Sequence, residues 1–304
     1  MNYFSIWWLA IRPKTLSIAL SPVLLGSALS WHSQAAFSLL TFIIILISAL
    51  CIQIGTNLYN DAADFEKGAD TPERLGPKRA AQQGWLNAGQ IKRGALISFF
   101  MAFLAGIYLA YLGGMAIIIL GLISILCGYA YTGGPKAIAY TPLGELFVIV
   151  FFGFAAVGGS FYLQSHTINY SVLILATGIG SMAAAILLVN NYRDLEGDRK
   201  VKKLTLVHYI GRPMARKLYV FMMSYPYLLL LVLLPQYPWT ILLALFSLPL
   251  AIMLIGYFLR MEITSELNKV LAYTAQLQLL YTLLLSLGLW LSQGLWLPPS
   301  LWPS

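Results

Sequence analysis

Residues 38–60 read SLLTFIIILISALCIQIGTNLYN, and the chain continues over residues 61–70 as DAADFEKGAD. The first stretch is almost entirely apolar and exceeds the roughly 20 residues that a helix needs to cross a bilayer. Carboxylates follow it at once, and ionisable groups beside a transmembrane helix are costly unless they have a function. This stretch therefore predicts a membrane helix that ends in a functional acidic cluster.

The rest of the sequence repeats the apolar pattern. Of its 304 residues 59% are hydrophobic and 10% are charged, and the mean hydropathy is +0.77. So few polar side chains cannot cover a water-soluble globule, and a soluble protein is excluded. We expect one polytopic, all-α membrane domain over residues 1–304, with nine transmembrane helices around a central cavity. The predicted helices lie near residues 15–31, 38–60, 94–112, 114–132, 143–163, 170–191, 215–234, 239–259 and 272–292.

The first 14 residues, MNYFSIWWLAIRPK, differ from a secretory signal peptide. Their charges follow the apolar part, and no small-residue cleavage site is present. No Arg- and Ser-rich leader typical of an organelle transit peptide precedes the first span either. With Trp7 and Trp8, residues 1–14 instead predict a short helix lying at the membrane interface.

The basic residues predict the orientation. All 19 Lys and Arg residues lie before the first predicted helix or in the connections 2–3, 4–5, 6–7 and 8–9. By the positive-inside rule these segments and the N-terminus are cytoplasmic, and an odd number of helices places the C-terminus outside. We expect a bacterial cytoplasmic (inner) membrane protein. Its net charge of +8 reflects this polarity, and no basic soluble module for nucleic acid is present.

All 11 acidic residues lie on the same side, mostly in two clusters. The second cluster, NNYRDLEGDRK over residues 190–200, matches the first at a shift of 130 residues. The matched pairs are Asn60 with Asn190, Asp64 with Asp194, and Glu66 with Glu196, while Asp61 meets Asn191. Equivalent motifs at equivalent helix ends indicate a duplicated architecture, with motif halves around 57–70 and 190–200 and a cytoplasmic active site.

Offsets of three and four residues bring the carboxylates of each cluster onto one helix face. Such pairs repel unless a cation lies between them, and carboxylate and amide oxygens suit Mg²⁺. Two facing sites of this kind would hold a diphosphate. The predicted catalytic carboxylates are Asp61, Asp64, Asp194 and Asp198. The predicted metal ligands are Asn60, Asp61, Asp64, Asp70, Asn190, Asp194 and Asp198.

Basic residues are interleaved with both clusters, as neutralisation of a diphosphate requires. The alternative is that the acidic residues form solvated salt bridges with these basic residues at the membrane surface. Two clusters with matching spacing favour the metal interpretation.

These motifs resemble those of the UbiA-type intramembrane prenyltransferase superfamily. Its members share nine helices, an Asn-Asp-x-x-Asp motif after helix 2 and an Asp-x-x-x-Asp motif after helix 6. Further segments resemble, within it, 1,4-dihydroxy-2-naphthoate polyprenyltransferases of the menaquinone pathway. These segments are RPKTLSIALSPVLLG (12–26), DFEKGAD with ERLGPKRA (64–80), YTGGP with LGELFVIVFFG (131–153) and NNYRDLEGDRKVKKLTL (190–206).

The resemblance implies Mg²⁺-dependent transfer of a polyprenyl group from polyprenyl diphosphate to 1,4-dihydroxy-2-naphthoate, with loss of the ring carboxylate, giving demethylmenaquinone. Arg12, Lys14 and Asn57 are candidates for binding the aromatic acid. Tyr129, Tyr131 and Tyr140 either face the allylic cation with their rings or belong to an interfacial aromatic belt. The predicted substrate-binding residues are Asn57, Lys67, Arg74, Arg79, Tyr131, Lys136, Arg193, Lys200, Arg12 and Lys14.

Two alternatives remain. Another aromatic prenyltransferase would act on 4-hydroxybenzoate, homogentisate, haem or a chlorophyllide. A cation transporter would use the aspartates as ion ligands, but transport needs a polar path through both leaflets, and the predicted outer halves contain no ionisable side chain. We therefore favour the enzyme.

Overall fold

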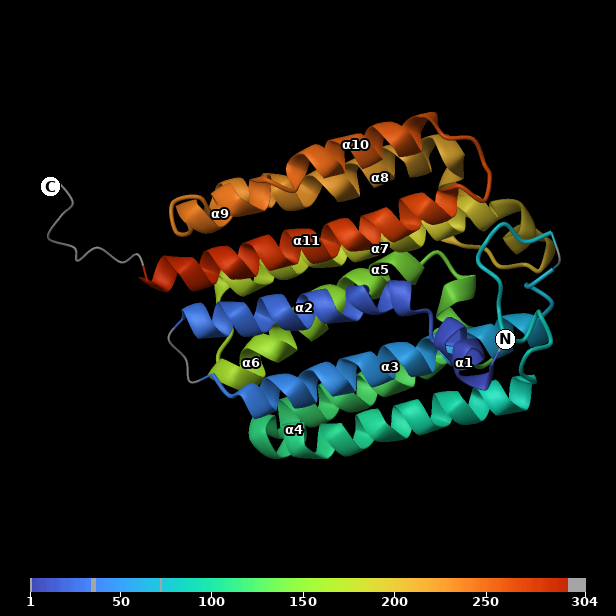
Figure 1. The fold of residues 1–304 in the computed structure, drawn as a ribbon, viewed down its shortest axis with the longest axis horizontal. Helices are drawn as coiled ribbons and strands as arrows, with labels where there is room; N and C mark the ends of the chain where they lie inside the picture. The colour runs from blue at the N-terminus through green and yellow to red at the C-terminus, as the bar shows by residue number, and fades with distance from the viewer. Residues whose placement is uncertain (1, 34–36, 72, 295–304) are drawn as a thin grey trace, which may run out of the picture.

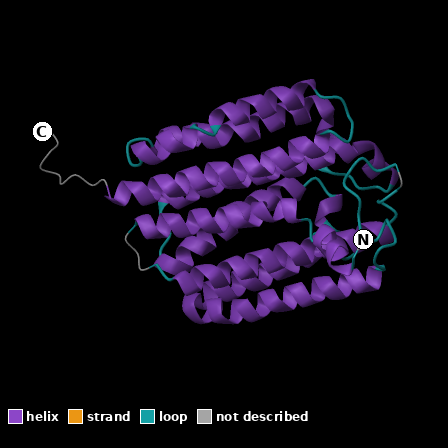
Figure 2. Cartoon of the chain, viewed as in Figure 1, coloured by secondary structure: helices purple, strands orange, loops and turns teal. Residues whose placement is uncertain are grey.

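The computed structural model describes residues 2–33, 37–71 and 73–294, and within them every regular element is a helix (Figure 2). This confirms the all-α prediction for the described residues. The elements are α1 (Tyr3–Ala10), α2 (Pro13–His32), α3 (Leu39–Glu66), α4 (Ala88–Ala130), η1 (Ile138–Tyr140), α5 (Gly144–Val148), η2 (Ile149–Gly158), α6 (Gly159–Ser165), α7 (Tyr170–Lys200), α8 (Leu206–Leu233), α9 (Pro238–Leu245), α10 (Leu248–Arg260) and α11 (Leu267–Gly294).

The longest helix, α4, consists of two arms that meet at Gly114. Gly114 adopts φ 65° and ψ −155°, a conformation that a residue with a Cβ rarely adopts. The predicted segments 94–112 and 114–132 fall on these two arms. At the start of α4 the Asn87 side chain accepts the N–H of Gln90, whose side chain accepts the N–H of Asn87 in return.

Six helical segments of the described residues are long and apolar enough to cross a membrane. They are α3, α4, the combined α5, η2 and α6 (Gly144–Ser165), α7, α8 and α11; α9 and α10, bent by 41°, give a seventh if they form one span. The chain is therefore a multi-pass membrane protein. The nine predicted segments all fall on helices. The count of six is smaller because the two arms of α4 are taken as one segment and because α2 is not included.

Helix α7 lies at the centre of the bundle. In its most apolar window 83% of residues are buried, against 17% in α3 and in α4. Its neighbours include α8, α11 and the π-helical segment η2. A Cβ on Gly180 of α7 would lie 2.7 Å from the Ile149 carbonyl oxygen, so glycine permits this close approach to η2.

The long polar loops gather at one end of the bundle (Figure 1). This end holds the α3–α4 loop, the C-terminal end of α7 and helix α1, whereas α11 ends at the opposite end. Helix α1 confirms a helix within residues 1–14, and Phe4 and Trp8 on it are exposed. Its position at a membrane interface stays a prediction, and the C-terminal residue lies outside the described residues.

Candidate active site

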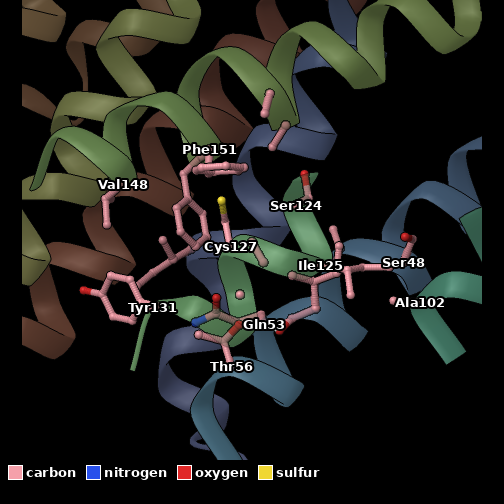
Figure 3. A pocket seen from close by; sticks show the side chains of 18 of the residues that line it. Ser48, Gln53, Thr56, Ala102, Ser124, Ile125, Cys127, Tyr131, Val148 and Phe151 are labelled. Carbon is pink, nitrogen blue, oxygen red and sulfur yellow. Dashed lines mark hydrogen bonds between the residues drawn. The ribbon is translucent and has the colours of Figure 1, made fainter. Parts of the chain in front are cut away.

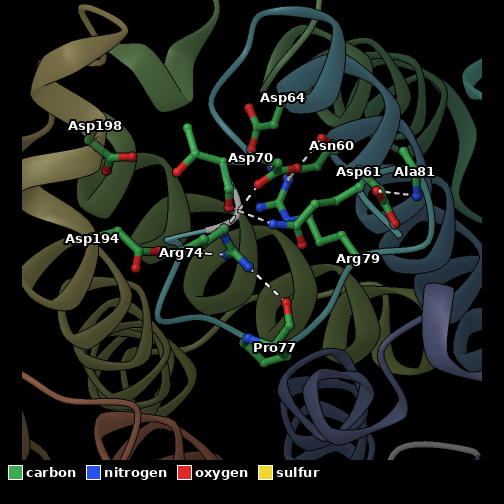
Figure 4. Close-up of polar contacts among 12 residues, drawn as sticks. Asn60, Asp61, Asp64, Asp70, Arg74, Pro77, Arg79, Ala81, Asp194 and Asp198 are labelled. Atoms are coloured by element: carbon green, nitrogen blue, oxygen red, sulfur yellow. Dashed lines mark hydrogen bonds and ion pairs between the residues drawn. The ribbon is translucent and has the colours of Figure 1, made fainter. Parts of the chain in front are cut away.

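The first cluster lies at the end of α3 and in the loop after it, where Arg79 of the α3–α4 loop pairs with two of its carboxylates. The Arg79 Nη1 donates to Asp64 Oδ2 at 2.8 Å and to Asp70 Oδ2 at 2.9 Å (Figure 4). Burial alone would lower the pKa of this guanidinium, but the carboxylates of Asp64, Asp70 and Asp61 raise it above its ordinary value. Asp64 Oδ1 also accepts a hydrogen bond of 2.9 Å from the Tyr140 hydroxyl.

Asp61 is one turn earlier on α3 and binds the backbone. Its Oδ2 accepts the N–H of Ala80 at 3.0 Å, and its Oδ1 accepts the N–H of Ala81 at 3.3 Å (Figure 4). The Asp61 side chain is buried, with 1% exposure. This carboxylate therefore anchors the loop that carries Arg79, and its predicted role as a metal ligand stays a prediction.

The second cluster lies on α7 and is organised by the buried Arg193. Its Nε and Nη2 donate to the two carboxylate oxygens of Asp194, at 2.7 and 2.6 Å. The same guanidinium donates to Asn190 Oδ1 at 2.7 Å and to Asn268 Oδ1 on α11 at 2.6 Å. Protein groups thus occupy most of the Arg193 donors, and a phosphate contact by Arg193 stays a prediction.

Arg74 joins the two clusters. Its Nε lies 3.2 Å from Asp70 Oδ1, and its Nη2 lies 3.6 Å from Asp194 Oδ2 (Figure 4). Burial, together with the like charge of Arg79, lowers the pKa of Arg74 to about 10, so the guanidinium stays charged at neutral pH. Two motifs 130 residues apart in the sequence are therefore brought together in one site.

Two buried oxygens, one in each motif, remain without a hydrogen-bond partner among the described residues. They are Asn60 Oδ1 and Asp198 Oδ2; the other Asp198 oxygen lies 3.3 Å from Lys203 Nζ. Within the described part of the chain no three Asp, Glu, His or Cys side chains converge on a metal position. Mg²⁺ does not need three, because it is held by one or two carboxylates together with waters and substrate phosphates. The residues present therefore fit Mg²⁺.

A cavity of about 590 Å³ adjoins the clusters (Figure 3). Polar residues line one part of it: Arg12, Asn57, Asn60, Arg79, Asn190, Asn191 and Lys203. Mostly apolar residues of α2, α3, α4, η2 and α7 line the remainder, together with the uncharged polar side chains of Ser48, Gln53, Thr56, Ser124 and Ser160. Along α3 the lining runs from Asn60 back to Ile45, roughly 22 Å at 1.5 Å per residue. The charged lining residues therefore lie beside the carboxylates, and the lining beyond them is mostly apolar.

Arg12 reaches this cavity from the junction of α1 and α2. The Asn57 side chain fixes the junction by donating to the Ile11 carbonyl at 3.0 Å and to Thr15 Oγ1 at 3.1 Å. Arg12 itself adopts φ 56°, in the left-handed region that is unfavourable for a residue with a side chain. Its Nη2 is buried without a partner among the described residues. Burial and the neighbouring Arg79 lower the pKa of Arg12 to about 9.

Several predicted substrate-binding residues do not line the cavity. Lys14 and Lys136 are exposed, and Lys200 is an exposed partner of Glu73 at 3.4 Å. Lys67 Nζ donates to the Thr132 carbonyl at 2.7 Å, and the same nitrogen lies 4.4 Å from the centre of the Tyr140 ring. Their substrate contacts stay predictions.

Of the three tyrosines, Tyr131 lines the cavity. Tyr140 lies at the first cluster through its hydrogen bond to Asp64. The ring of Tyr129 packs against Tyr59, with ring centres 4.8 Å apart. The structure therefore brings Tyr131 and Tyr140 to the site.

Sequence reasoning missed three residues of the site. Lys203 lines the cavity and pairs with Asp198. Asn191 also lines the cavity, and its Nδ2 donates to Oε1 of the buried Glu145 at 2.9 Å. Glu145 could have been found from the sequence, because it is a single acidic residue that begins an apolar segment. No sequence pattern indicates its contact with Asn191.

Comparison with known proteins gives the family. A model of the UbiA prenyltransferase family matches residues 19–280. The chain belongs to this family. The sequence resemblance is thereby confirmed, and the carboxylate clusters and cavity described above are those of a UbiA-family protein.

Relatives within the UbiA family cover nearly the whole chain. The 1,4-dihydroxy-2-naphthoate octaprenyltransferase of Haemophilus influenzae is 35% identical over 93% of this chain and 95% of its own. The protein of the same description from Bacillus subtilis is 35% identical over 93% and 92%. A solved UbiA homolog from Archaeoglobus fulgidus, bound to DMAPP and Mg²⁺, has a TM-score of 0.59 at 15% identity, covering 92% of this chain and 99% of its own. This last likeness shows that the fold is shared.

Proposed function

We propose that this UbiA-family chain transfers a polyprenyl group from polyprenyl diphosphate to 1,4-dihydroxy-2-naphthoate. The observation that carries the proposal is a cavity whose charged side chains lie beside two carboxylate clusters and whose lining beyond them is mostly apolar. A prenyl diphosphate has the same division between a charged head and an apolar tail. The naphthoate acceptor is supported by the descriptions of the Haemophilus influenzae and Bacillus subtilis relatives.

The charged end of the cavity binds the diphosphate. Arg79 and Lys203 line it, and each now neutralises a carboxylate. Arg74, between Asp70 and Asp194, adds a third positive charge. Guanidinium and ammonium groups suit phosphate oxygens, and in a buried site their charge is weakly screened. These side chains bind the diphosphate and hold its departing negative charge.

Mg²⁺ at this site would further neutralise the diphosphate, as a Lewis acid does for a leaving group. Asn60 and Asp198, with their unpartnered oxygens, and the neighbouring Asp64 and Asp194 are the side chains that would hold it. The Archaeoglobus fulgidus homolog bound to DMAPP and Mg²⁺ supports this cofactor.

Arg12 binds the acceptor. Its buried Nη2 lacks a partner, and a carboxylate is the natural partner of a buried guanidinium. With the carboxylate on Arg12, the naphthoate ring is held against the cavity wall, and orientation of two reactants lowers the barrier substantially. The Tyr131 ring in that wall adds an electron-rich face that attracts positive charge.

The chemistry balances within this arrangement. The bond between the prenyl carbon and the diphosphate oxygen breaks, and its electron pair leaves with the diphosphate. The ring carbon that bears the carboxylate donates an electron pair to the allylic cation. The bond to the ring carboxylate then breaks, carbon dioxide leaves, and its electron pair restores the aromatic ring. The product is the quinol form of demethylmenaquinone.

We infer nine crossings and a cytoplasmic active site. Counting α2 and both arms of α4, with α9 and α10 as one span, gives nine helices. The 19 basic residues support a cytoplasmic location for the end that holds the clusters. Cysteines introduced at Ser165 and Gln236 should be labelled from the periplasm, and one at Lys202 from the cytoplasm. Labelling of all three from one side would contradict this topology.

The test of function is mass spectrometry of the lipid formed by purified protein from 1,4-dihydroxy-2-naphthoate, Mg²⁺ and a series of prenyl diphosphates. We expect a prenylated, decarboxylated naphthoquinol, and no product in excess EDTA. Product with 4-hydroxybenzoate or homogentisate in place of the naphthoate would assign another acceptor. Full activity in EDTA would remove the metal from the mechanism.

A further inference from the structure

Glu145 is a buried carboxyl group for which the mechanism has no role. It lies in the first turn of α5 with 2% exposure. Its Oε1 accepts the 2.9 Å hydrogen bond from Asn191 Nδ2, whereas its Oε2 is buried with no partner in the part of the chain that the structure describes. No cation among the described residues forms an ion pair with it. A buried carboxyl group without a cation is costly, and helix packing alone gives no reason to keep one.

Glu145 reaches the cavity through Asn191. Glu145 is not a lining residue, whereas Asn191 is, so a substrate in the cavity contacts Asn191 and not the carboxyl group. The neighbouring Asn190 also lines the cavity, but its Oδ1 is taken by Arg193. Asn191 is therefore the amide of this pair whose oxygen is available.

The contact fixes the orientation of the Asn191 amide. An amide has one donating and one accepting end, and a carboxylate oxygen accepts only from the donating end. With Nδ2 on Glu145, Oδ1 is left as the acceptor, and no described residue donates to it. A ligand hydroxyl group in the cavity could donate the hydrogen bond that Asn191 Oδ1 lacks.

We propose that Glu145 is a positioning residue for the aromatic acceptor, holding the Asn191 amide so that Oδ1 accepts a hydrogen bond from a ring hydroxyl. The inference rests on the proposed function, because the hydroxyl belongs to the hydroxylated naphthoate. Arg12 holds the carboxylate and Asn191 holds a hydroxyl. Two contacts at different points of the ring determine which ring carbon meets the prenyl carbon.

The experiment compares Glu145→Ala, Glu145→Gln, Asn191→Ala and the double variant Glu145→Ala/Asn191→Ala. KM is measured separately for the acceptor and for the prenyl diphosphate. Each single alanine variant should raise the acceptor KM about tenfold, the effect of one lost hydrogen bond. The KM for prenyl diphosphate should stay within about twofold of the parent value, because a lost hydrogen bond affects only the ligand that makes it.

Two further comparisons separate positioning from other roles. Glu145→Gln should retain most of the acceptor affinity, because the glutamine carbonyl still accepts from Asn191 Nδ2. The double variant should be no worse than Asn191→Ala alone, because Glu145 acts through Asn191. Glu266→Gln is the matched control, since Glu266 is an exposed carboxylate paired with Lys269. Thermal unfolding of each variant reports its folding.

An unchanged acceptor KM in Glu145→Ala would overturn the inference, as would an equal rise of both KM values. A Glu145→Gln variant as impaired as Glu145→Ala would assign the carboxyl group to charge or proton transfer and overturn positioning. If Glu145→Ala does not fold, Asn191→Ala decides, because a selective rise of the acceptor KM is required of it too.

Failure of the proposed function gives a different result. A parent protein that transfers no prenyl group to any hydroxylated aromatic acid overturns that function, and the inference with it. A parent that is active on the naphthoate while its Glu145 variants keep the parent acceptor KM overturns the inference alone.

Discussion

At the end of α3, the carboxylates of Asp61, Asp64 and Asp70 are all held by the loop that follows, through Arg79 and two backbone N–H groups. On α7, Asp194 is held by its sequence neighbour Arg193 and by Arg74. Among the described residues, Asp198 has one cationic partner, Lys203, and one oxygen without a partner. The two motifs match in sequence, but every carboxylate oxygen of the first has a partner, whereas Asp198 Oδ2 of the second has none among the described residues.

This difference teaches that a repeated motif determines where the carboxylates lie. The side chains and backbone groups around each carboxylate determine which ligands it can bind. The carboxylate oxygens of the first cluster are all taken, so a metal or a diphosphate must compete there with Arg79 and the other donors. The second offers a buried carboxylate oxygen without a partner among the described residues, which costs free energy until a cation completes it. We therefore expect ligand binding to begin at the α7 cluster, and the predictions below test the contrast between the clusters.

The largest effect is expected from Arg79→Leu on the α3 side. It leaves Asp64 and Asp70 as buried carboxylates without their shared cation, which typically costs about 3–5 kcal/mol. Thermal unfolding in detergent should show a large fall in melting temperature. Lys203→Leu on the α7 side should cost less, because Asp198 already has one unpartnered oxygen. Equal losses would contradict the difference between the clusters.

A loss of activity of similar size should follow from Asp64→Asn and Asp194→Asn, one in each cluster. Each removes a negative charge expected to support the metal and diphosphate, and we expect turnover to fall at least a hundredfold, roughly 3 kcal/mol. Product formation at saturating substrates measures it, with thermal unfolding as the control for folding. Near-normal turnover in either variant would indicate that the carboxylates of its cluster only form salt bridges with neighbouring basic residues.

Much of this architecture was readable from the sequence. Apolar length placed the predicted segments on helices, and the break near residue 113 is the bend at Gly114. The shifted motif predicted a site shared by Asp64 and Asp194; the structure places Arg74 between Asp70 and Asp194, and the functional roles of these residues stay predictions. Both rest on local patterns that a sequence displays directly.

What the sequence could not show depends on contacts between distant segments. Asp61 is held by the backbone of two alanines, and a backbone N–H carries no signature in the sequence. The contact between Glu145 and Asn191 exists only because α5 packs against α7. Lys14 and Lys136 were predicted to bind substrate because they are basic residues near a motif, but both are exposed. Position in the sequence alone did not show this.

A smaller effect should distinguish Asp198→Asn from Asp61→Asn. Asp198 has the free oxygen, so its loss of charge should raise the Mg²⁺ concentration for half-maximal rate about tenfold, with partial recovery at high Mg²⁺. Asp61→Asn weakens the anchor of the Arg79 loop and should mainly lower thermal stability. Titration of Mg²⁺ against initial rate measures both. A larger Mg²⁺ shift in Asp61→Asn would place the metal on the α3 side.

The smallest effect is expected from Tyr140→Phe, which changes the one neutral side-chain donor in the α3 cluster. Burial and the Asp64 carboxylate raise the pKa of Tyr140, so its hydroxyl stays protonated and donates to Asp64 Oδ1. Phenylalanine keeps the ring beside Lys67 and removes only this hydrogen bond. One such bond contributes about 1 kcal/mol, so turnover should fall roughly fivefold.

The matched comparison for Tyr140→Phe is Tyr140→Leu, which removes the ring as well as the hydroxyl. The Tyr140 ring already lies beside the positive charge of Lys67. If the ring also stabilises positive charge during the reaction, turnover in the leucine variant should be a further few-fold lower than in Tyr140→Phe. Equal rates in the two variants would limit Tyr140 to its hydrogen bond with Asp64. Parent-like turnover in Tyr140→Phe would contradict this prediction and would show that the reaction does not depend on the hydrogen bond from Tyr140 to Asp64.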